Sequence, residues 1–125
     1  MSSTLRRGIV LFAHGSRDPL WHKPMEAVAH QIALAQTDAA VVCAYLELST
    51  PDLPSAVAGL VQQGILTITV VPMFLGVGKH ARADLPVLTE ALRLQYPTVS
   101  FTLQPAVGEN PRLIALLADI ALHGA

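Results

Sequence analysis

Residues 8–13 read GIVLFA, and His14, Gly15 and Ser16 follow directly. A continuous apolar run, without the polar alternation of a half-exposed strand, is typical of a parallel strand that is covered on both faces. Two further runs have the same continuous character and a third is shorter: residues 40–46 (AVVCAYL), 66–73 (LTITVVPM) and 99–103 (VSFTL). The sequence therefore predicts four largely buried strands.

Helix-like segments alternate with these strands. Apolar residues recur at helical spacing in residues 25–35, 55–63, 87–94 and 112–122. Proline suits the first turn of a helix, because its missing N–H has no partner there. A proline stands at each expected helix start: Pro24, Pro51 or Pro54, Pro86 and Pro111. Thr50 and Asn110 are expected N-caps, and Gly64 is an expected stop after the second helix.

This alternation predicts βα units with parallel strands and right-handed crossovers. We expect one α/β domain over residues 1–125, built from four βα units. Its sheet should have the strand order 2-1-3-4, with helices on both faces.

Composition narrows the class of protein. Hydrophobic residues make up 52% of the chain and charged residues 14%, which hints at oligomerisation. A net charge of −1 is unlike the basic balance of a general nucleic-acid binder. The N-terminus does not resemble a signal peptide and no apolar run reaches about 18 residues, so we expect a cytoplasmic protein without a membrane span. The lone Cys43 is expected to be buried and unreactive.

The candidate site lies after the strands, because ligands of open α/β sheets bind beyond the carboxyl ends of the strands. His14 follows the first strand, Glu47 the second and residues 74–80 the third. If helices begin near Pro24 and Pro86, two of these connections run to about ten residues, beyond the usual two to six. Extra loop length at this edge indicates function.

His14, His80 and Glu47 are placed to converge at this edge of the sheet. Neutral imidazole is a common ligand of Co, Fe, Ni and Zn ions, and it accepts protons near neutral pH. Such a ligand set leaves coordination positions open, as an active metal site requires. Each residue also has a plainer interpretation, as a hydrogen-bonded structural histidine or a solvated acid.

Three other histidines are weaker candidates. We expect His22 to be a surface residue, with ligand contact as the alternative, His30 to lie on a helix face and His123 to lie in the tail. Half of the eight Lys and Arg residues fall in the two long connections: Arg17, Lys23, Lys79 and Arg82. This local positive charge would attract an anionic substrate, although solvated loop charges would cluster in the same way.

Two phosphate-binding patterns are incomplete. The run from Gly76 through Gly78 to Ala81 resembles the dinucleotide fingerprint, but it follows the third strand and Pro86 interrupts the expected helix. Gly78 and Lys79 resemble the end of a phosphate loop, but a histidine stands where Ser or Thr is required. We therefore expect no ATP site, and a nucleotide-binding α/β module stays as an alternative.

Three motifs together resemble a known family. They are residues 10–19 (VLFAHGSRDP), Leu46-Glu47 and residues 72–86 (PMFLGVGKHARADLP). The chain is similar over nearly its whole length to the class II, ATP-independent chelatases, above all to the short sirohydrochlorin chelatases of sirohaem and cobalamin synthesis.

The resemblance implies a parallel α/β fold and the insertion of a divalent metal into sirohydrochlorin, with no permanent cofactor. The metal is a substrate, Co²⁺ or Fe²⁺, with Ni²⁺ ranked behind them. His14 and His80 match the metal-binding histidines of the family, and Glu47 matches an acidic residue at the edge of the active site. The expected contacts of the substrate are Arg17, Lys79, Arg82, Ser16, Gly76 and Gly78.

Longer members of the family contain two such lobes, so the resemblance implies that a single-lobe chain forms a homodimer. The expected partners are therefore an anionic tetrapyrrole and a second copy of the chain, with no nucleic acid and no membrane. A carrier that binds the metal or the tetrapyrrole without turnover stays as the alternative function.

Overall fold

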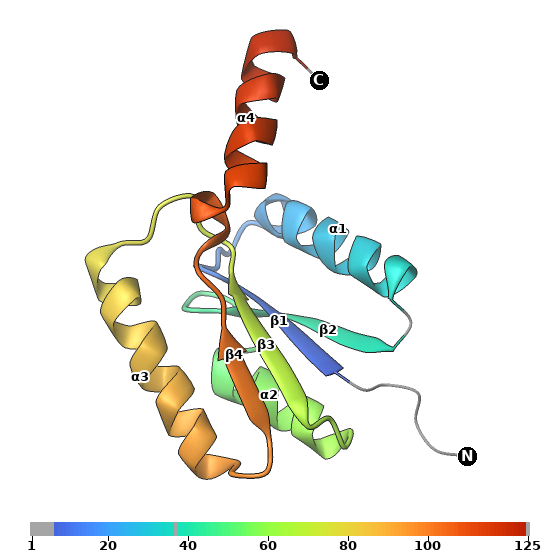
Figure 1. Cartoon of the computed structure of the whole chain (residues 1–125), viewed down its shortest axis with the longest axis vertical. Helices are drawn as coiled ribbons and strands as arrows, with labels where there is room; N and C mark the ends of the chain where they lie inside the picture. Colours follow the sequence, from blue (N-terminus) through green and yellow to red (C-terminus); the bar gives the residue numbers. More distant parts are fainter. Residues whose placement is uncertain (1–6, 37, 125) are drawn as a thin grey trace.

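The computed structural model describes residues 7–36 and 38–124, which form an open parallel sheet with helices around it (Figure 1). The strands are β1 (Arg7–Ala13), β2 (Ala39–Tyr45), β3 (Thr67–Pro72) and β4 (Ser100–Leu103). Their order is β2-β1-β3-β4 and every neighbouring pair is parallel. The predicted fold class and strand order are confirmed.

Helices cover both faces of the sheet. They are α1 (Pro19–Ala35), α2 (Leu53–Gln62), α3 (Lys79–Gln95) and α4 (Pro111–His123). The helix α1 packs on one face over β1 and β2, whereas α2 and α3 pack on the other face. After a short 3-10 turn (Val107–Glu109), α4 projects away from the rest of the fold, beyond the end of β4 (Figure 1).

The central strand β1 is buried on both faces, which explains its unbroken apolar run. Val10 and Phe12 belong to the larger apolar core, which lies between the sheet and α2 and α3. Leu11 and Ala13 belong to a smaller core under α1, because successive side chains of a strand point to opposite faces. All four side chains are at most 2% exposed, so β1 has no polar face.

The first and third helices begin earlier than the prolines predicted. Asp18 caps α1, since its carboxylate accepts a hydrogen bond from the Leu20 N–H at 2.9 Å, and Pro19 is the first helical residue. Pro24 and Pro86 lie inside α1 and α3. The connections are therefore residues 14–18 and 73–78, which are ordinary lengths. The prediction of two long loops was wrong.

Packing explains why α3 continues through Pro86. A proline inside a helix costs about 3 kcal/mol or more, but burial of one leucine contributes about 1.5–3 kcal/mol. Four residues of α3 face the core: Ala81, Leu85, Thr89 and Leu92. The carbonyl that loses its partner at Pro86 belongs to Arg82, which is exposed to water. The stripe of buried side chains thus outweighs the lost hydrogen bond.

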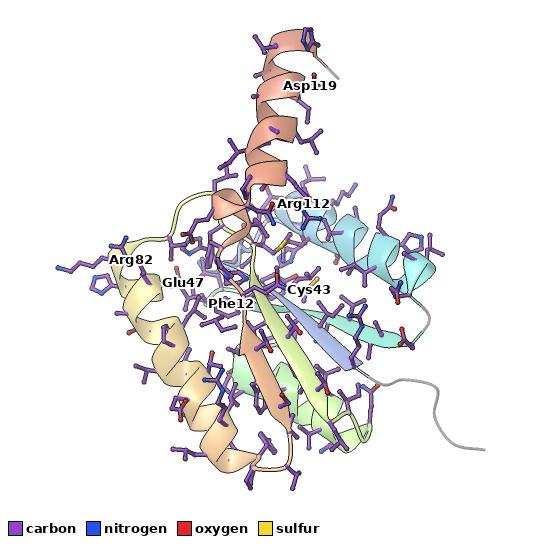
Figure 2. All side chains as sticks on the ribbon, in the orientation of Figure 1. Phe12, Cys43, Glu47, Arg82, Arg112 and Asp119 are labelled. Carbon is purple, nitrogen blue, oxygen red and sulfur yellow. The ribbon has the colours of Figure 1, made fainter. Side chains whose placement is uncertain are left out.

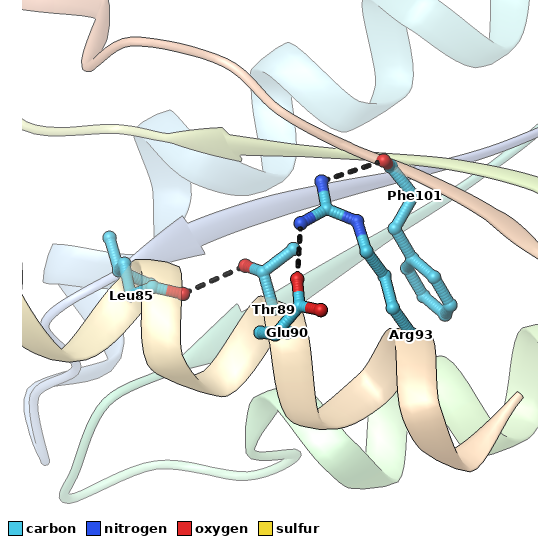
Figure 3. Close-up of polar contacts among 5 residues, drawn as sticks. All are labelled: Leu85, Thr89, Glu90, Arg93 and Phe101. Atoms are coloured by element: carbon cyan, nitrogen blue, oxygen red, sulfur yellow. Dashed lines mark hydrogen bonds and ion pairs between the residues drawn. The ribbon is translucent and has the colours of Figure 1, made fainter.

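Polar contacts also fasten α3 to the sheet (Figure 3). The Thr89 hydroxyl donates to the Leu85 carbonyl at 2.8 Å, so this buried polar group is satisfied. The Arg93 guanidinium donates to the Phe101 carbonyl of β4 at 3.0 Å and pairs with Glu90 at 3.1 Å. Arg93 therefore links the last turns of α3 to the edge strand.

The other predicted helix ends are confirmed, except for the N-cap of α2. Asn110 caps α4 and Pro111 begins it, as predicted. Gly64 follows α2 with a positive φ of 83°, a backbone conformation that favours glycine. The cap of α2 is Asp52 and not Thr50, because the Asp52 carboxylate accepts from the Ser55 N–H at 2.9 Å. Within the described residues, no helix is long and apolar enough to cross a membrane.

The cap of α2 predicts a pH-dependent stability. Hydrogen bonds from Ser55 hold the pKa of the Asp52 carboxyl below its ordinary value. A lowered folded pKa gives stability that is complete above the unfolded pKa of about 3.9 and is lost as the pH falls through the folded value. We expect Asp52→Ala to lower the free energy of unfolding by about 1 kcal/mol at neutral pH, and by less near pH 3.

Urea unfolding followed by circular dichroism measures this difference at both pH values. The matched control is Asp52→Asn, which keeps a capping oxygen but cannot ionise, so it should lose only a few tenths of a kcal/mol at neutral pH and less near pH 3. A deficit in Asp52→Ala that is the same in acid and at neutral pH contradicts the assignment of Asp52 as a charged cap.

Candidate functional site

His14 and Glu47 lie side by side at the carboxyl edge of the sheet. The Leu46 N–H donates to the Ala13 carbonyl and the Glu47 N–H donates to the His14 carbonyl, both at 2.9 Å. The hydrogen-bond ladder between β1 and β2 thus continues past the ends of both strands. Both side chains are exposed, and the backbone hydrogen bond fixes the two residues that carry the imidazole and the carboxylate next to each other.

Gly15 allows this close approach. Its φ is +103°, and a Cβ atom built on it would collide with the carbonyl oxygen of Glu47. Only glycine combines the positive φ with the missing side chain that this contact requires. The turn after Glu47 is also unusual, because Leu48 has a φ of 63°. Two backbone constraints therefore fix the turn that carries Glu47.

A polar network joins the loop after β1 to the loop after β2. The Ser16 N–H donates to the Ser49 hydroxyl at 3.0 Å, and that hydroxyl donates back to the Ser16 carbonyl at 2.8 Å. His22, on α1, reaches the same carbonyl with Nε2 at 2.8 Å. The prediction that His22 is a surface residue was wrong: it is half-buried and belongs to this network. Sequence reasoning missed Ser49 entirely.

The ring of His14 rests on an apolar base. Its centroid lies 4.7 Å from that of Phe74, which is buried and packs edge-on against Phe12 at 6.1 Å. The Gly108 N–H donates to the Phe74 carbonyl at 2.9 Å. Phe74 is therefore held by the core on one side and by the turn after β4 on the other, and it limits how the imidazole can lie.

His80 occupies the first turn of α3 and is exposed. The same part of the chain contains Gly76, in the connection, and Gly78, which precedes the first residue of α3. Over residues 7–36 and 38–124, no three His, Cys, Asp or Glu side chains gather closely enough to hold a metal ion. The structure thus joins His14 to Glu47, and a shared role for His80 stays a prediction.

The four cations that were predicted for the two long connections do not all lie in connections. Only Arg17 lies in a connection, whereas Lys23 is on α1 and both Lys79 and Arg82 begin α3, because these helices start earlier than expected. All four side chains are exposed. In Figure 2, Arg82 lies on the outer flank of the fold, at the start of α3.

Arg112 is a further cation that sequence reasoning did not single out. It is the second residue of α4, and its N–H donates to the Asn110 side chain at 2.9 Å. With Met73 and Leu116 it lines a shallow cavity of about 350 Å³ beside the end of β3. Figure 2 shows Arg112 near the base of α4. The available signal was an arginine directly after Pro111, where the sequence predicted that the last helix begins.

The other titratable candidates lie outside the site. Cys43 is half-buried and not buried as predicted, but desolvation still raises the pKa of its thiol above the ordinary value, which agrees with an unreactive cysteine. Burial also raises the pKa of Tyr45 to about 12. His30 is exposed on α1, as predicted. His123 ends α4 as an exposed residue, with its Nε2 atom 3.9 Å from Asp119.

Comparison with known proteins identifies relatives of the chain. Residues 8–122 match the sequence profile of the CbiX family. Sirohydrochlorin cobaltochelatase from Methanosarcina acetivorans is 35% identical over 83 residues, which cover 66% of this chain and 64% of that protein. The chloroplastic sirohydrochlorin ferrochelatase of Arabidopsis thaliana is 28% identical over 93% of this chain and 52% of its own length. The matched segment thus spans between half and two thirds of these relatives.

A solved structure has the same fold over its whole length. It is a CbiX protein from Marinobacter aquaeolei VT8 that has been assigned to cobalamin (vitamin B12) biosynthesis. The two chains are 36% identical and superpose with a TM-score of 0.78, covering 93% of this chain and 94% of the other. The predicted chelatase-like fold is confirmed by this similarity.

The contact between Gly15 and Glu47 can be tested by substitution. We expect Gly15→Ala to lower the free energy of unfolding by more than about 2 kcal/mol, because the new Cβ meets a backbone carbonyl in a strained conformation. Gly76→Ala is the matched control, since a Cβ there has nothing within 4 Å, and it should change stability by about 0.5 kcal/mol or less. Urea unfolding measures both values, and equal stability of the two variants contradicts the described turn.

Proposed function

Because the chain belongs to the CbiX family, we propose that it inserts Co²⁺ or Fe²⁺ into sirohydrochlorin without ATP. The observation that carries the proposal is the pairing of His14 with Glu47, whose backbones are hydrogen-bonded at the ligand-binding edge of the sheet. An imidazole and a carboxylate in this position can both hold a divalent metal and accept protons.

The proposed reaction exchanges protons for metal. The metal substrate binds His14 and His80, with Glu47 beside them, and its other coordination positions stay open for the pyrrole nitrogens. Two pyrrole protons leave as two nitrogen–metal bonds form. Proximity and orientation supply much of the acceleration, and a neutral imidazole or the carboxylate takes up the protons.

Sirohydrochlorin carries many carboxylates, which suit the positive charge at this edge. We infer that Arg17, Lys79 and Arg82 bind these carboxylates, and that Ser16, Gly76 and Gly78 border the substrate. Arg112 extends the same charge onto α4. Local charge of this kind attracts an anion despite the net charge of −1. Ni²⁺ ranks behind Co²⁺ and Fe²⁺, and the cytoplasm stays the predicted location.

We also propose that the working form is a homodimer, with α4 in the interface. No residue of α4 is buried, although Ile114, Leu116, Leu117, Ile120 and Leu122 are large and apolar. Its polar side chains, Arg112, Asp119 and His123, are spaced so that they share one narrow line of the helix. A helix that is apolar around most of its circumference is normally covered.

The exposed area supports the same assembly. The five large apolar side chains of α4 are each 40–77% exposed. A stable interface buries roughly 800 Å² on each partner, and an uncovered apolar helix can supply a large part of that area. A second copy is favoured as the partner because α4 projects from the same edge as His14, and a paired lobe there would close the substrate site.

The insertion activity is tested by mixing the protein with sirohydrochlorin and Co²⁺ or Fe²⁺, anaerobically and without ATP, and following the absorption spectrum. We expect many turnovers, reduced by about 100-fold or more in His14→Ala and His80→Ala and about tenfold or more in Glu47→Gln. His30→Ala, an exposed histidine on α1, is the matched control with unchanged rate.

The alternatives give different results in the same assay. A spectral change that stops at one equivalent indicates a carrier without turnover. Full activity in both histidine variants rejects the assigned site, and no spectral change at all rejects the chelatase.

The dimer is tested by sedimentation or light scattering. We expect a particle of twice the 13.3 kDa chain mass, and dissociation in Leu117→Glu and Ile120→Glu because each places a charge in an apolar interface. Leu94→Glu is the matched control, since Leu94 is an exposed leucine of α3 away from α4. A monomer at micromolar concentration, or equal dissociation by all three substitutions, contradicts the assembly.

A further inference from the structure

The side chain of His22 connects three separate elements, and the proposed reaction makes no use of it. It belongs to α1, its Nε2 atom lies 2.8 Å from the Ser16 carbonyl oxygen, and the same atom lies 3.2 Å from the Ser49 hydroxyl. A carbonyl oxygen can only accept, so Nε2 carries the proton and donates. His22 therefore acts in the structure as a hydrogen-bond donor from the helix to both loops.

From this geometry we propose that His22 is a positioning residue, which acts through Ser16 and Ser49 to hold His14 and Glu47 in the arrangement that accepts the metal. The proposal rests on the proposed function only for the identity of the metal-binding pair. Ser16 lies two residues after His14, and Ser49 lies two residues after Glu47. The bonded serines thus join the two loops just beyond the two functional side chains.

The ring of His22 is itself held in place. Its centroid lies 5.0 Å from the ring of Tyr45 and 5.2 Å from the ring of Trp21, and both contacts are edge-to-face. Tyr45 is the last residue of β2 and is only 4% exposed. The donor on Nε2 is therefore fixed relative to the sheet, so the carbonyl of Ser16 is fixed relative to the sheet as well.

The backbone just after Glu47 is strained, and the hydrogen bonds among His22, Ser16 and Ser49 oppose that strain. Leu48 has a φ of 63°, a conformation that a leucine rarely adopts and that surrounding contacts must maintain. The next residue is Ser49, which makes two hydrogen bonds to Ser16 and contacts His22. Without the network, the loop that carries Glu47 would lose the contacts that oppose this strain, and the carboxylate would move away from His14.

The size of the effect follows from known metal sites. Residues that orient metal ligands through hydrogen bonds typically change metal affinity or activity by about 10–100-fold when they are lost. A positioning role for His22 depends on the donor at Nε2 and not on the ring as such. Glutamine places an N–H donor near Nε2, whereas asparagine places its amide near Nδ1, too short to reach the Ser16 carbonyl.

The experiment therefore compares His22→Gln with His22→Asn in the full chain, titrated with Co²⁺ alone and with sirohydrochlorin alone. We expect His22→Asn to weaken Co²⁺ binding about tenfold and His22→Gln to restore most of that loss. Sirohydrochlorin affinity should change less than twofold in both variants. Ser49→Ala should resemble His22→Asn, and His30→Asn, on the same helix, is the control that keeps the wild-type Co²⁺ affinity.

Amide hydrogen exchange gives a second readout that does not depend on the metal. The Glu47 and Ser16 amides should exchange faster in His22→Asn and Ser49→Ala than in His22→Gln. Equal Co²⁺ affinity and equal exchange in the two His22 variants overturns the proposal. If wild-type protein binds no Co²⁺, the proposed function fails, and the exchange rates alone then decide whether His22 holds the two loops.

Discussion

The parallel pairing of β1 with β2 on one side and β3 on the other is the constraint on which the rest of the structure depends. Because β1 is central and buried on both faces, its end cannot shift without disturbing both cores. His14 is the first residue beyond that end. Its backbone carbonyl still belongs to the ladder, through the bond from Glu47, so the functional edge inherits the rigidity of the sheet. Gly15 and the two hydrogen bonds between Ser16 and Ser49 then extend this rigidity into the loops.

The connections after β1 and β3 are shorter than the prolines predicted, which leaves less irregular backbone to be ordered at the functional edge. The connection after β1 ends at the cap of α1 and the connection after β3 ends at the first turn of α3. The early start of α3 consequently places Lys79, His80 and Arg82 on a regular helical backbone and not in a long loop. Ordering such residues costs less conformational entropy than ordering a long loop would. The apolar α4 stands at the same edge, which connects the proposed dimer with the proposed site.

The sequence predicted the sheet well because burial leaves a periodic signal. All four strands lie within about one residue of their apolar runs, and the order of the strands follows from right-handed crossovers. The starts of α1 and α3 were wrong because tertiary packing and the Asp18 cap outweigh the cost of an internal proline. Ser49 and Arg112 were missed, and His22 was expected to be a surface residue, because contacts between residues far apart in the chain leave no spacing to detect. Ser16 and Ser49 are 33 residues apart, for example.

The same geometry bears on whether the metal is stored or passed on. A site that retains a metal surrounds it with a closed ligand set, while a site that reacts keeps positions open. His14 and Glu47 are joined through a backbone hydrogen bond, and both side chains are exposed to solvent. Exposed ligands on a rigid backbone can hold a metal in a defined place while its remaining coordination positions stay open. Open, oriented binding suits an ion that must leave for the pyrrole nitrogens, and it favours an enzyme over a carrier.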